Sequence, residues 1–429
     1  MPRILLLATT TGYQTRAFDE AAERLGLDLV YATDRCHVLD NPWRDDAIPV
    51  RFSDDELSVA AILAAAERLP IDAVLTVGDR PAVLAARVAE ALGLPGHPPD
   101  AAAAASSKRL TRERFQRANL AAPWFVVTDI SREPRELGAP LRFPCVVKPV
   151  ALSGSRGVMR ADDENELVAA FYRLRALMQS PDVRVERNPD HELALVEAFI
   201  PGREFAIEGV MSYGALQVLA IFDKPDALNG PFFEETIYIT PSSARFEEQE
   251  RIVDAVRLAV KAIGLRHGPI HAECRINEAG VYVLEVAARP IGGLCARALR
   301  FEHGVASREI DSRSLEELLM RHALGEAPDG WSRESSASGV MMIPIPRRGI
   351  FRRVTGIDEA RRVEGVEDVR ITAKPDQLLV PLPEGASYLG FIFARGARGA
   401  DVEDALRASH RLLHFTIDPE LAVLQSLHG

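Results

Sequence analysis

The first hundred residues alternate short apolar segments with amphipathic ones. Predicted strands cover residues 3–9 (RILLLAT), 27–34 and 71–79, and predicted helices cover 17–26 and 81–92. Strands that alternate with helices indicate parallel βαβ units, so we expect a Rossmann-like domain over residues 1–100. The first turn, TTTGYQT, lacks the G-x-G-x-x-G spacing, which argues against a dinucleotide site of the usual type.

The pattern changes after the Gly/Pro/Ala-rich stretch 93–107, which is a candidate linker. A predicted helix (108–120), a strand (144–150) and a helix (163–178) come next. Predicted strands follow at 193–200, 203–211, 215–223, 268–277 and 281–289, with a helix at 246–263. Residues 331–429 begin with strand-like SGVMMIPIP and end in a helix (401–413), which predicts a separate α+β lobe. The expected fold class is α/β followed by α+β.

Composition excludes several classes of protein. A net charge of -11 and a pI near 5.5 argue against nucleic-acid binding, which needs clustered Lys and Arg. The apolar run Ile4 to Ala8 is too short for a signal peptide or a membrane span, so we expect a soluble, cytoplasmic protein with no membrane partner. Four cysteines without C-x-x-C spacing are expected to be buried and reduced: Cys36, Cys145, Cys274 and Cys295.

Lysine is scarce: five of the 51 basic residues are lysine, and the rest are arginine. The planar fork of arginine does not replace a compact ammonium in a tight phosphate pocket, so retained lysines mark candidate phosphate contacts. Lys108, Lys148 and Lys224 lie in segments with other candidate residues, whereas Lys261 and Lys374 are expected at the surface.

The stretch KPVALSGSRGV (148–158) places a lysine before a Gly/Ser loop, the reverse of the P-loop order. Lys148 ends a predicted strand, and the small residues after it allow backbone amides to approach a phosphate closely. By itself, however, a strand followed by a Gly/Ser loop favours an ordinary turn.

The predicted hairpin 268–289 contains two acidic positions. A three-residue loop Glu278–Gly280 sets Asn277 opposite Val281 and therefore Glu273 opposite Glu285. Facing carboxylates among apolar residues need a shared proton or a cation, and oxygen ligands favour Mg²⁺ held together with substrate phosphates. Arg289 follows on the same strand face. A longer loop would shift the register by one and leave one glutamate in solvent; both readings stand.

The motifs in this order resemble the ATP-grasp superfamily over residues 100–300: Lys108, then VVKP with a Gly/Ser loop, then VEAFIPGREF, then Glu273, then EVAAR. The segment 222–242 followed by HAE and LEVAAR is most similar to the L-amino-acid (dipeptide) ligase branch of carboxylate–amine ligases. The resemblance implies a Rossmann-like pre-ATP-grasp domain (1–100), two ATP-grasp subdomains (101–185, with the glycine-rich lid, and 186–325, with the metal site) and a C-terminal domain (331–429) that completes the substrate pocket.

The resemblance also implies roles for individual residues. ATP would be bound by Lys108, Lys148, Gly154, Ser155, Gly157, Glu197, Ala198, Phe199, Ile200 and Glu204. Mg²⁺, or Mn²⁺ in its place, would be bound by Glu273 and Glu285. Catalysis would rest on Lys148 and Arg289, and substrate would meet Glu235, Tyr238, His271 and Arg289, with Lys224 nearby. Many ATP-grasp enzymes have Asn two residues after the second metal carboxylate; Ala287 stands there, as in the dipeptide-ligase branch.

The implied activity is ATP-dependent joining of an acid and an amine, both small molecules and expected to be amino acids, through an acyl phosphate. The protein is expected to form a homodimer, since dimers are common in similar families. Two alternatives stay open: an ATP-grasp enzyme acting on a purine-pathway intermediate, bicarbonate or a natural-product acid, and a nucleotide-binding module without turnover.

Overall fold

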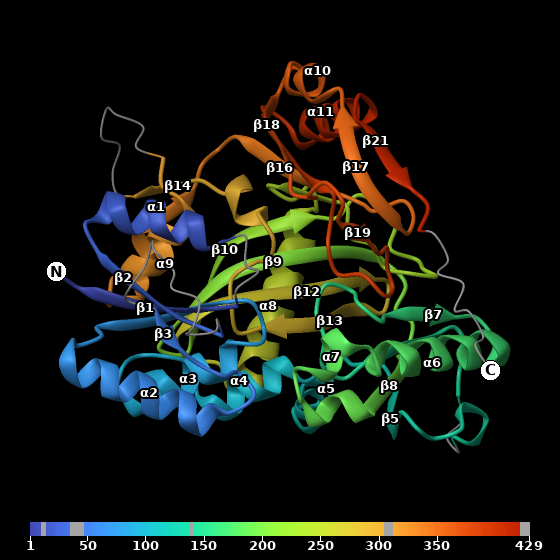
Figure 1. Cartoon of the computed structure of the whole chain (residues 1–429), viewed down its shortest axis with the longest axis horizontal. Helices are drawn as coiled ribbons and strands as arrows, with labels where there is room; N and C mark the ends of the chain where they lie inside the picture. The colour runs from blue at the N-terminus through green and yellow to red at the C-terminus, as the bar shows by residue number, and fades with distance from the viewer. Residues whose placement is uncertain (10–13, 35–46, 138–140, 304–311, 421–429) are drawn as a thin grey trace, which may run out of the picture.

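The structure is a computed structural model that describes residues 1–9, 14–34, 47–137, 141–303 and 312–420. Its N-terminal part is the predicted parallel βαβ domain, drawn in blue in Figure 1. The sheet has the order β3-β2-β1-β4, with every neighbouring pair parallel. Its elements are β1 (Arg3–Ala8), α1 (Thr15–Leu25), β2 (Asp28–Thr33), β3 (Ile48–Pro49), α2 (Asp55–Arg68), β4 (Ala73–Val77) and α3 (Ala82–Ala91). Residues 10–13 of the first turn and Cys36 lie outside the described residues.

The alanine-rich linker forms a buried helix. Helix α4 (Pro99–Ser106) begins with proline, whose fixed φ suits the first turn of a helix, and Ala101, Ala102 and Ala104 are almost completely buried. Small side chains allow α4 to pack closely against α3 and the next helix, α5 (Lys108–Arg117). The segment therefore joins two domains as a packed element.

The next unit is a four-stranded sheet of order β5-β8-β6-β7, antiparallel throughout. It contains β5 (Phe125–Asp129), β6 (Cys145–Pro149), β7 (Met159–Ala161), α6 (Glu164–Met178), α7 (Pro181–Arg184) and β8 (Leu193–Ala198). Leu167, Phe171 and Leu174 on one face of α6 are fully buried, as the helical spacing of its apolar residues predicts. Lys148 lies on β6 and Glu197 on the adjacent β8.

An eight-stranded sheet runs through the rest of the molecule in the order β13-β12-β9-β10-β11-β16-β20-β18. Its strands are β9 (Arg203–Ser212), β10 (Ala215–Asp223), β11 (Ile237–Thr240), β12 (Gly268–Asn277), β13 (Gly280–Ala287), β16 (Ala337–Ile343), β18 (Val366–Ile371) and β20 (Gly390–Gly396). Because β11 pairs with β16, the sheet continues from the predicted subdomain 186–325 into the predicted C-terminal domain 331–429. The division at residue 331 stays a prediction, but backbone hydrogen bonds join the two sides.

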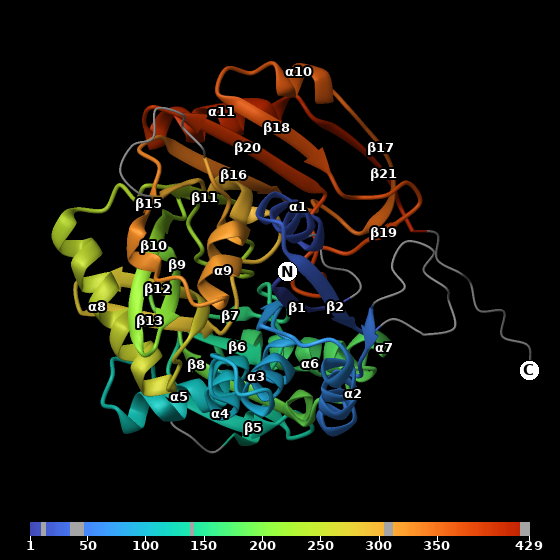
Figure 2. The ribbon, with the colours of Figure 1, turned by 90° about the vertical axis from the view of Figure 1, so that its left-hand side faces the viewer.

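The helices and small sheets cover this long sheet. Helix α8 (Phe246–Ile263) packs on β13, and α11 (Gly399–Arg411) packs on β16 and β20. The remaining elements are α9 (Leu315–Ala323), α10 (Ile357–Arg361), the pair β14 (Phe301–His303) and β15 (Trp331–Arg333), and the sheet β19 (Leu378–Leu379), β17 (Gly349–Thr355) and β21 (His414–Asp418). Figure 2 shows the C-terminal domain above the N-terminal domain and the two ATP-grasp units.

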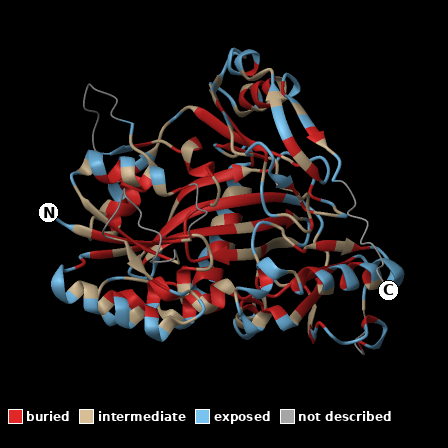
Figure 3. Cartoon of the chain, in the orientation of Figure 1, coloured by how far each residue is buried: buried red, intermediate tan, exposed pale blue. Residues whose placement is uncertain are grey.

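One apolar core joins the N-terminal domain to the long sheet. It contains Leu6 and Phe18 from the first domain, Val210 and Phe222 from the sheet, and Leu318 from α9. Figure 3 shows buried residues along the central strands and exposed ones on the outer helices. This shared core fixes the position of the loop after β4 relative to the loop after β13.

Three of the four cysteines, Cys145, Cys274 and Cys295, are buried and free. Burial raises the pKa of each thiol, as expected for unreactive core residues. In the described part of the chain, no helix combines the length and apolar character needed to cross a bilayer.

Candidate active site

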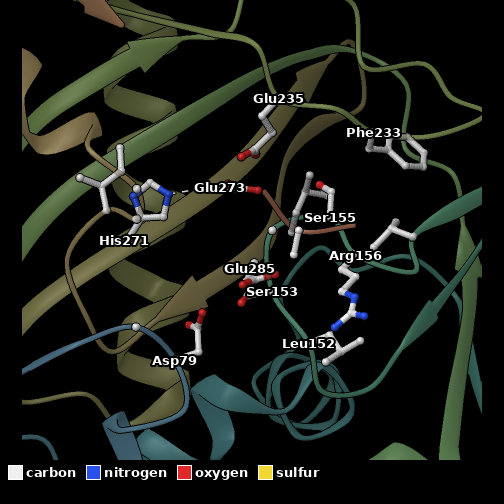
Figure 4. A pocket seen from close by; sticks show the side chains of 18 of the residues that line it. Asp79, Leu152, Ser153, Ser155, Arg156, Phe233, Glu235, His271, Glu273 and Glu285 are labelled. Atoms are coloured by element: carbon white, nitrogen blue, oxygen red, sulfur yellow. Dashed lines mark ion pairs between the residues drawn. The ribbon is translucent and has the colours of Figure 1, made fainter. Parts of the chain in front are cut away.

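A cavity of about 690 Å³ lies where the N-terminal domain, both central units and the C-terminal domain meet (Figure 4). It gathers nearly all the predicted site residues along its wall: Lys108, Lys148, Gly154, Ser155, Glu197, Ala198, Phe199, Ile200, Glu204, Glu235, Tyr238, His271, Glu273, Glu285 and Arg289. Gly157 does not line it; this glycine is packed against Leu174, Leu177 and Pro149 at the base of the loop.

The hairpin of β12 and β13 brings the two predicted metal carboxylates together by a route other than the predicted one. Asn277 pairs with Gly280, not with Val281, so the loop is one residue shorter than expected. A β-bulge at Leu284 then adds one residue to β13, and Glu273 pairs with Glu285. The predicted loop is wrong, whereas the predicted opposition of the carboxylates is confirmed.

Lys148 belongs to a buried group of three charges. The Glu197 carboxylate contacts the Lys148 ammonium and accepts a hydrogen bond from Arg112 Nε at 2.8 Å. Burial lowers the pKa of Lys148 to about 8, against the opposing effect of Glu197. Burial raises the pKa of Glu197, but Arg112 and Lys148 outweigh it and bring the value to about 2. Arg112, fully buried on α5, was not among the predicted site residues.

The glycine-serine loop is contacted by Lys108. Lys108 Nζ donates to Leu152 O at 2.7 Å and lies 3.7 Å from Glu285 Oε2, so one ammonium contacts both the loop and a predicted metal ligand. Gly154 and Ser155 both have positive φ, +64° and 56°. Glycine adopts this left-handed backbone at low cost, whereas the Cβ of Ser155 makes it unfavourable there. Both residues line the cavity, where a phosphate-covering segment would have to lie.

Arg289 is held by a residue of the N-terminal domain. Its guanidinium donates to both Asp79 oxygens, at 2.8 and 2.9 Å. Burial raises the pKa of Asp79, but Arg289 and the Ser153 hydroxyl outweigh it, and the net value lies below the ordinary one. Asp79 was missed by the sequence analysis, although its place after β4 is a signal: ligand sites collect at the carboxyl ends of parallel strands.

Lys224 lies beneath the cavity floor among three carboxylates. Its Nζ is 2.8 Å from Glu204, 2.5 Å from Glu235 and 3.1 Å from Glu273. Burial lowers the pKa of Lys224, but the three glutamates raise it well above the ordinary value. Among the described residues, these same three carboxylates form the one cluster with metal-ligand spacing, and a fixed ammonium already compensates it.

The donor set fits a hard cation on the cavity side of this cluster. Within the described part of the chain, Glu285 forms one ion pair, the 3.7 Å contact with Lys108; its side chain is 32% exposed and lines the cavity. Glu273 lies opposite it, and its pKa is well below the ordinary value because Lys224 and His271 outweigh burial. Two carboxylates on facing strands match the way proteins hold Mg²⁺ next to phosphates.

His271 bridges two carboxylates. Its Nδ1 is 3.0 Å from Glu208 Oε2 and its Nε2 is 3.7 Å from Glu273 Oε1. Burial lowers the pKa of His271, but the two glutamates raise it to about 9. Glu208, fully buried, also accepts from the Ile291 backbone amide at 3.1 Å. One carboxylate therefore orients both the histidine and the backbone beyond Arg289.

Aromatic residues and a second missed arginine line the region near the predicted hinge 197–200. The rings of Phe199 and Phe233 lie stacked with centroids 6.3 Å apart, and the Arg275 guanidinium lies 5.1 Å from the Phe199 centroid. Arg275 also donates to Glu204 at 2.6 Å and to Ile200 O at 2.7 Å, so both oxygens of Glu204 are engaged. Tyr238 is buried, with its hydroxyl 3.4 Å from Glu273.

Comparison with known sequences identifies three consecutive parts of the chain. Residues 19–96 match the ATP-grasp N-terminal domain, residues 141–298 the ATP-grasp domain, and residues 341–418 the L-amino acid ligase C-terminal domain 2. Alanine–anticapsin ligase of Bacillus subtilis is 28% identical over 56% of this chain and 52% of its own length. Carnosine synthase 1 of Gallus gallus is 30% identical over 53% of this chain and 25% of its own. The chain therefore spans about half the length of the first relative and a quarter of the length of the second.

Solved structures agree with this assignment. L-amino acid ligase from Bacillus licheniformis superposes with a TM-score of 0.81 at 28% identity, covering 97% of this chain and 99% of that one. N5-carboxyaminoimidazole ribonucleotide synthetase from Thermotoga maritima, at 15% identity and a TM-score of 0.67, shares the fold alone. The chain belongs to the ATP-grasp carboxylate–amine ligases and is close in sequence and fold to L-amino acid ligase.

Proposed function

We propose that the protein joins two amino acids by an amide bond, through an acyl phosphate, with release of ADP and phosphate. The observation that carries this proposal is the single cavity in which two lysines, a glycine-serine loop, facing carboxylates and a fixed arginine meet. The acid carboxylate would attack the γ-phosphate of ATP, and the amine would then displace phosphate from the acyl carbon. Such a reaction depends on positioning and charge neutralisation more than on covalent chemistry by the protein.

ATP would occupy the side of the cavity formed by the two ATP-grasp units. Lys108 and Lys148 would neutralise its phosphates, with the loop containing Gly154, Ser155 and Gly157 closing above them. The backbone of residues 197–200 would accept and donate to adenine beside the stacked Phe199 and Phe233. Glu204 would lie near the ribose, where its ion pairs with Lys224 and Arg275 hold it in place.

Mg²⁺, with Mn²⁺ as a substitute, would be held by Glu273 and Glu285. The ion supplies charge that offsets the phosphates during transfer. His271 and Lys108 would orient these carboxylates from the two sides. With Ala287 in place of a further oxygen ligand, we expect one metal to be bound more tightly than any second.

The acid and amine would occupy the side closed by the C-terminal domain. Arg289, held by Asp79, would stabilise the transferred phosphoryl group or the acyl phosphate. Glu235 would bind a substrate ammonium with the oxygen that faces away from Lys224, while Tyr238 and His271 border the same space. Closure of the loop would keep water from the acyl phosphate.

The test is a screen for phosphate release over pairs of amino acids, with mass detection of the product. Lys148→Met and Glu285→Gln should each lower the rate by more than tenfold, because the first removes an ammonium that would neutralise the phosphates and the second removes a carboxylate that would hold Mg²⁺. Lys261→Met, an exposed lysine on α8, is the matched control and should keep wild-type activity. Full activity in both site variants would refute the site assignment; no release with any pair would refute the proposed substrates.

The homodimer expectation stays a proposal, and light scattering of the purified protein tests it: a mass near 94 kDa, twice the 47.0 kDa of one chain, is expected.

A further inference from the structure

A segment of the C-terminal domain contacts the base of the glycine-serine loop. The Gly157 amide donates to Pro383 O at 2.8 Å, and Arg156 Nε donates to Glu384 O at 2.7 Å. These two residues stand where the loop rejoins β7, so its C-terminal end is hydrogen-bonded to another domain. Figure 4 shows Arg156 beside Ser155 at the cavity edge.

The Glu384 side chain makes a second link. Its carboxylate pairs with Arg173 of α6, with Nη2 2.8 Å from Oε2 and Nε closer still to Oε1. The Arg173 guanidinium also lies 4.9 Å from the Phe232 ring centroid. Both partners are partly exposed, 44% and 35%, and such pairs contribute little to the stability of a fold. The two-point contact between Arg173 and Glu384 does, however, join α6 to the C-terminal domain.

The same segment forms part of the cavity wall. Ala386, Ser387 and Tyr388 line the cavity, and the Tyr388 ring packs 6.1 Å from Phe391. The turn between is tight, since a Cβ on Gly385 would lie 1.8 Å from Val380 O. A short, closely packed turn transmits displacement of Glu384 to Tyr388.

We propose that residues 381–388 form a clasp that couples closure of the glycine-serine loop to formation of the substrate wall, with Glu384 and Arg173 as positioning residues. This inference rests on the proposed ligase function. When the loop closes over ATP, the clasp brings Tyr388 into place and excludes water. When the clasp is loosened, water attacks the acyl phosphate, and acid and phosphate are released without an amide. ATP is then consumed unproductively.

Two measurements on Glu384→Gln and Arg173→Ala test the clasp. The first is amide formed per ADP released, which should fall about two- to five-fold, the range that one exposed ion pair supports. The second is hydrogen exchange of residues 150–160 and 384–390 with Mg²⁺ and a non-hydrolysable ATP analogue. In the wild type both segments should gain protection together, and in the variants this gain should shrink.

The double variant should be no worse than either single variant, because both remove the same contact. Arg352→Ala, which breaks two exposed ion pairs of β17 in the same domain, is the control and should change neither readout. Unchanged coupling and protection in both variants would overturn the clasp, as would equal losses in the control. A wild type that protects both segments but forms no amide would overturn the ligase proposal and leave the clasp standing.

Discussion

The sharpest stability prediction concerns Glu197, which separates two buried cations. Its carboxylate lies between Arg112 and Lys148, and all three side chains are less than 10% exposed. Glu197→Gln preserves the shape of the side chain and removes its charge. Two cations then face each other in a poorly hydrated space, and the repulsion is relieved only if one of them loses a proton.

The two cations respond differently. Lys148 has a pKa of about 8, so removing its proton at pH 7.5 costs only about 0.7 kcal/mol, the equivalent of about half a pH unit. Lys148 can therefore become neutral when its carboxylate partner is removed. Arg112 cannot lose a proton. An unpaired buried charge costs about 3–5 kcal/mol, and almost all of this cost should fall on Arg112. We therefore expect Glu197→Gln to lower the free energy of unfolding by about 3–5 kcal/mol. Lys148→Met leaves the Arg112–Glu197 pair intact and should lower it by about 1 kcal/mol or less.

Urea unfolding followed by circular dichroism at pH 7.5 without nucleotide measures these values. Glu20→Gln, which breaks an exposed i,i+4 pair on α1, is the control and should stay within about 0.5 kcal/mol of wild type. Between pH 8 and 10 the unfolded chain holds the Lys148 proton more tightly than the folded one, so the wild type should gain stability relative to Lys148→Met. A loss for Lys148→Met as large as for Glu197→Gln would refute the reasoning.

Three further predictions follow from packing and burial. Burial lowers the pKa of His97 and of His322 to about 4. The unfolded chain therefore takes up protons first, and the free energy of unfolding should fall as the pH drops from 6.5 to 4. The urea midpoint at pH 5 should drop less in His322→Phe than in the wild type, and an equal drop would contradict this prediction. Gly157→Ala should lower the free energy of unfolding from a thermal melt by about 2 kcal/mol, because the φ of Gly157 is +74° and a Cβ would lie 3.0–3.1 Å from three side chains. Gly154→Ala has open space around it and should lower the free energy of unfolding by about 1 kcal/mol. Asp79→Ala leaves Arg289 buried and unpaired, so it should lower the free energy of unfolding by about 3 kcal/mol and the rate of ADP release at least tenfold. Normal turnover would contradict the positioning role of Asp79.

Local features of the chain were predictable because they depend on neighbouring residues. The βαβ pattern, the strand ending at Lys148 and the helix 246–263 follow from apolar periodicity, and the structure has them within a few residues. The facing of Glu273 and Glu285 was predicted for an incomplete reason. The loop is one residue shorter than expected, and the bulge at Leu284, which no turn rule specifies, restores the register.

Ordered motifs in the sequence determined the superfamily, the cavity residues and the class of reaction, because residue type and spacing along strands fix which side chains share a face. Only the tertiary structure decided what each charge is paired with. Asp79 reaches Arg289 from 210 residues away, Arg112 reaches Glu197 from helix α5, and Glu384 reaches the glycine-serine loop from the C-terminal part of the chain. The physical reason is that burial makes each charge require a partner, while the identity of that partner depends on how separate domains pack.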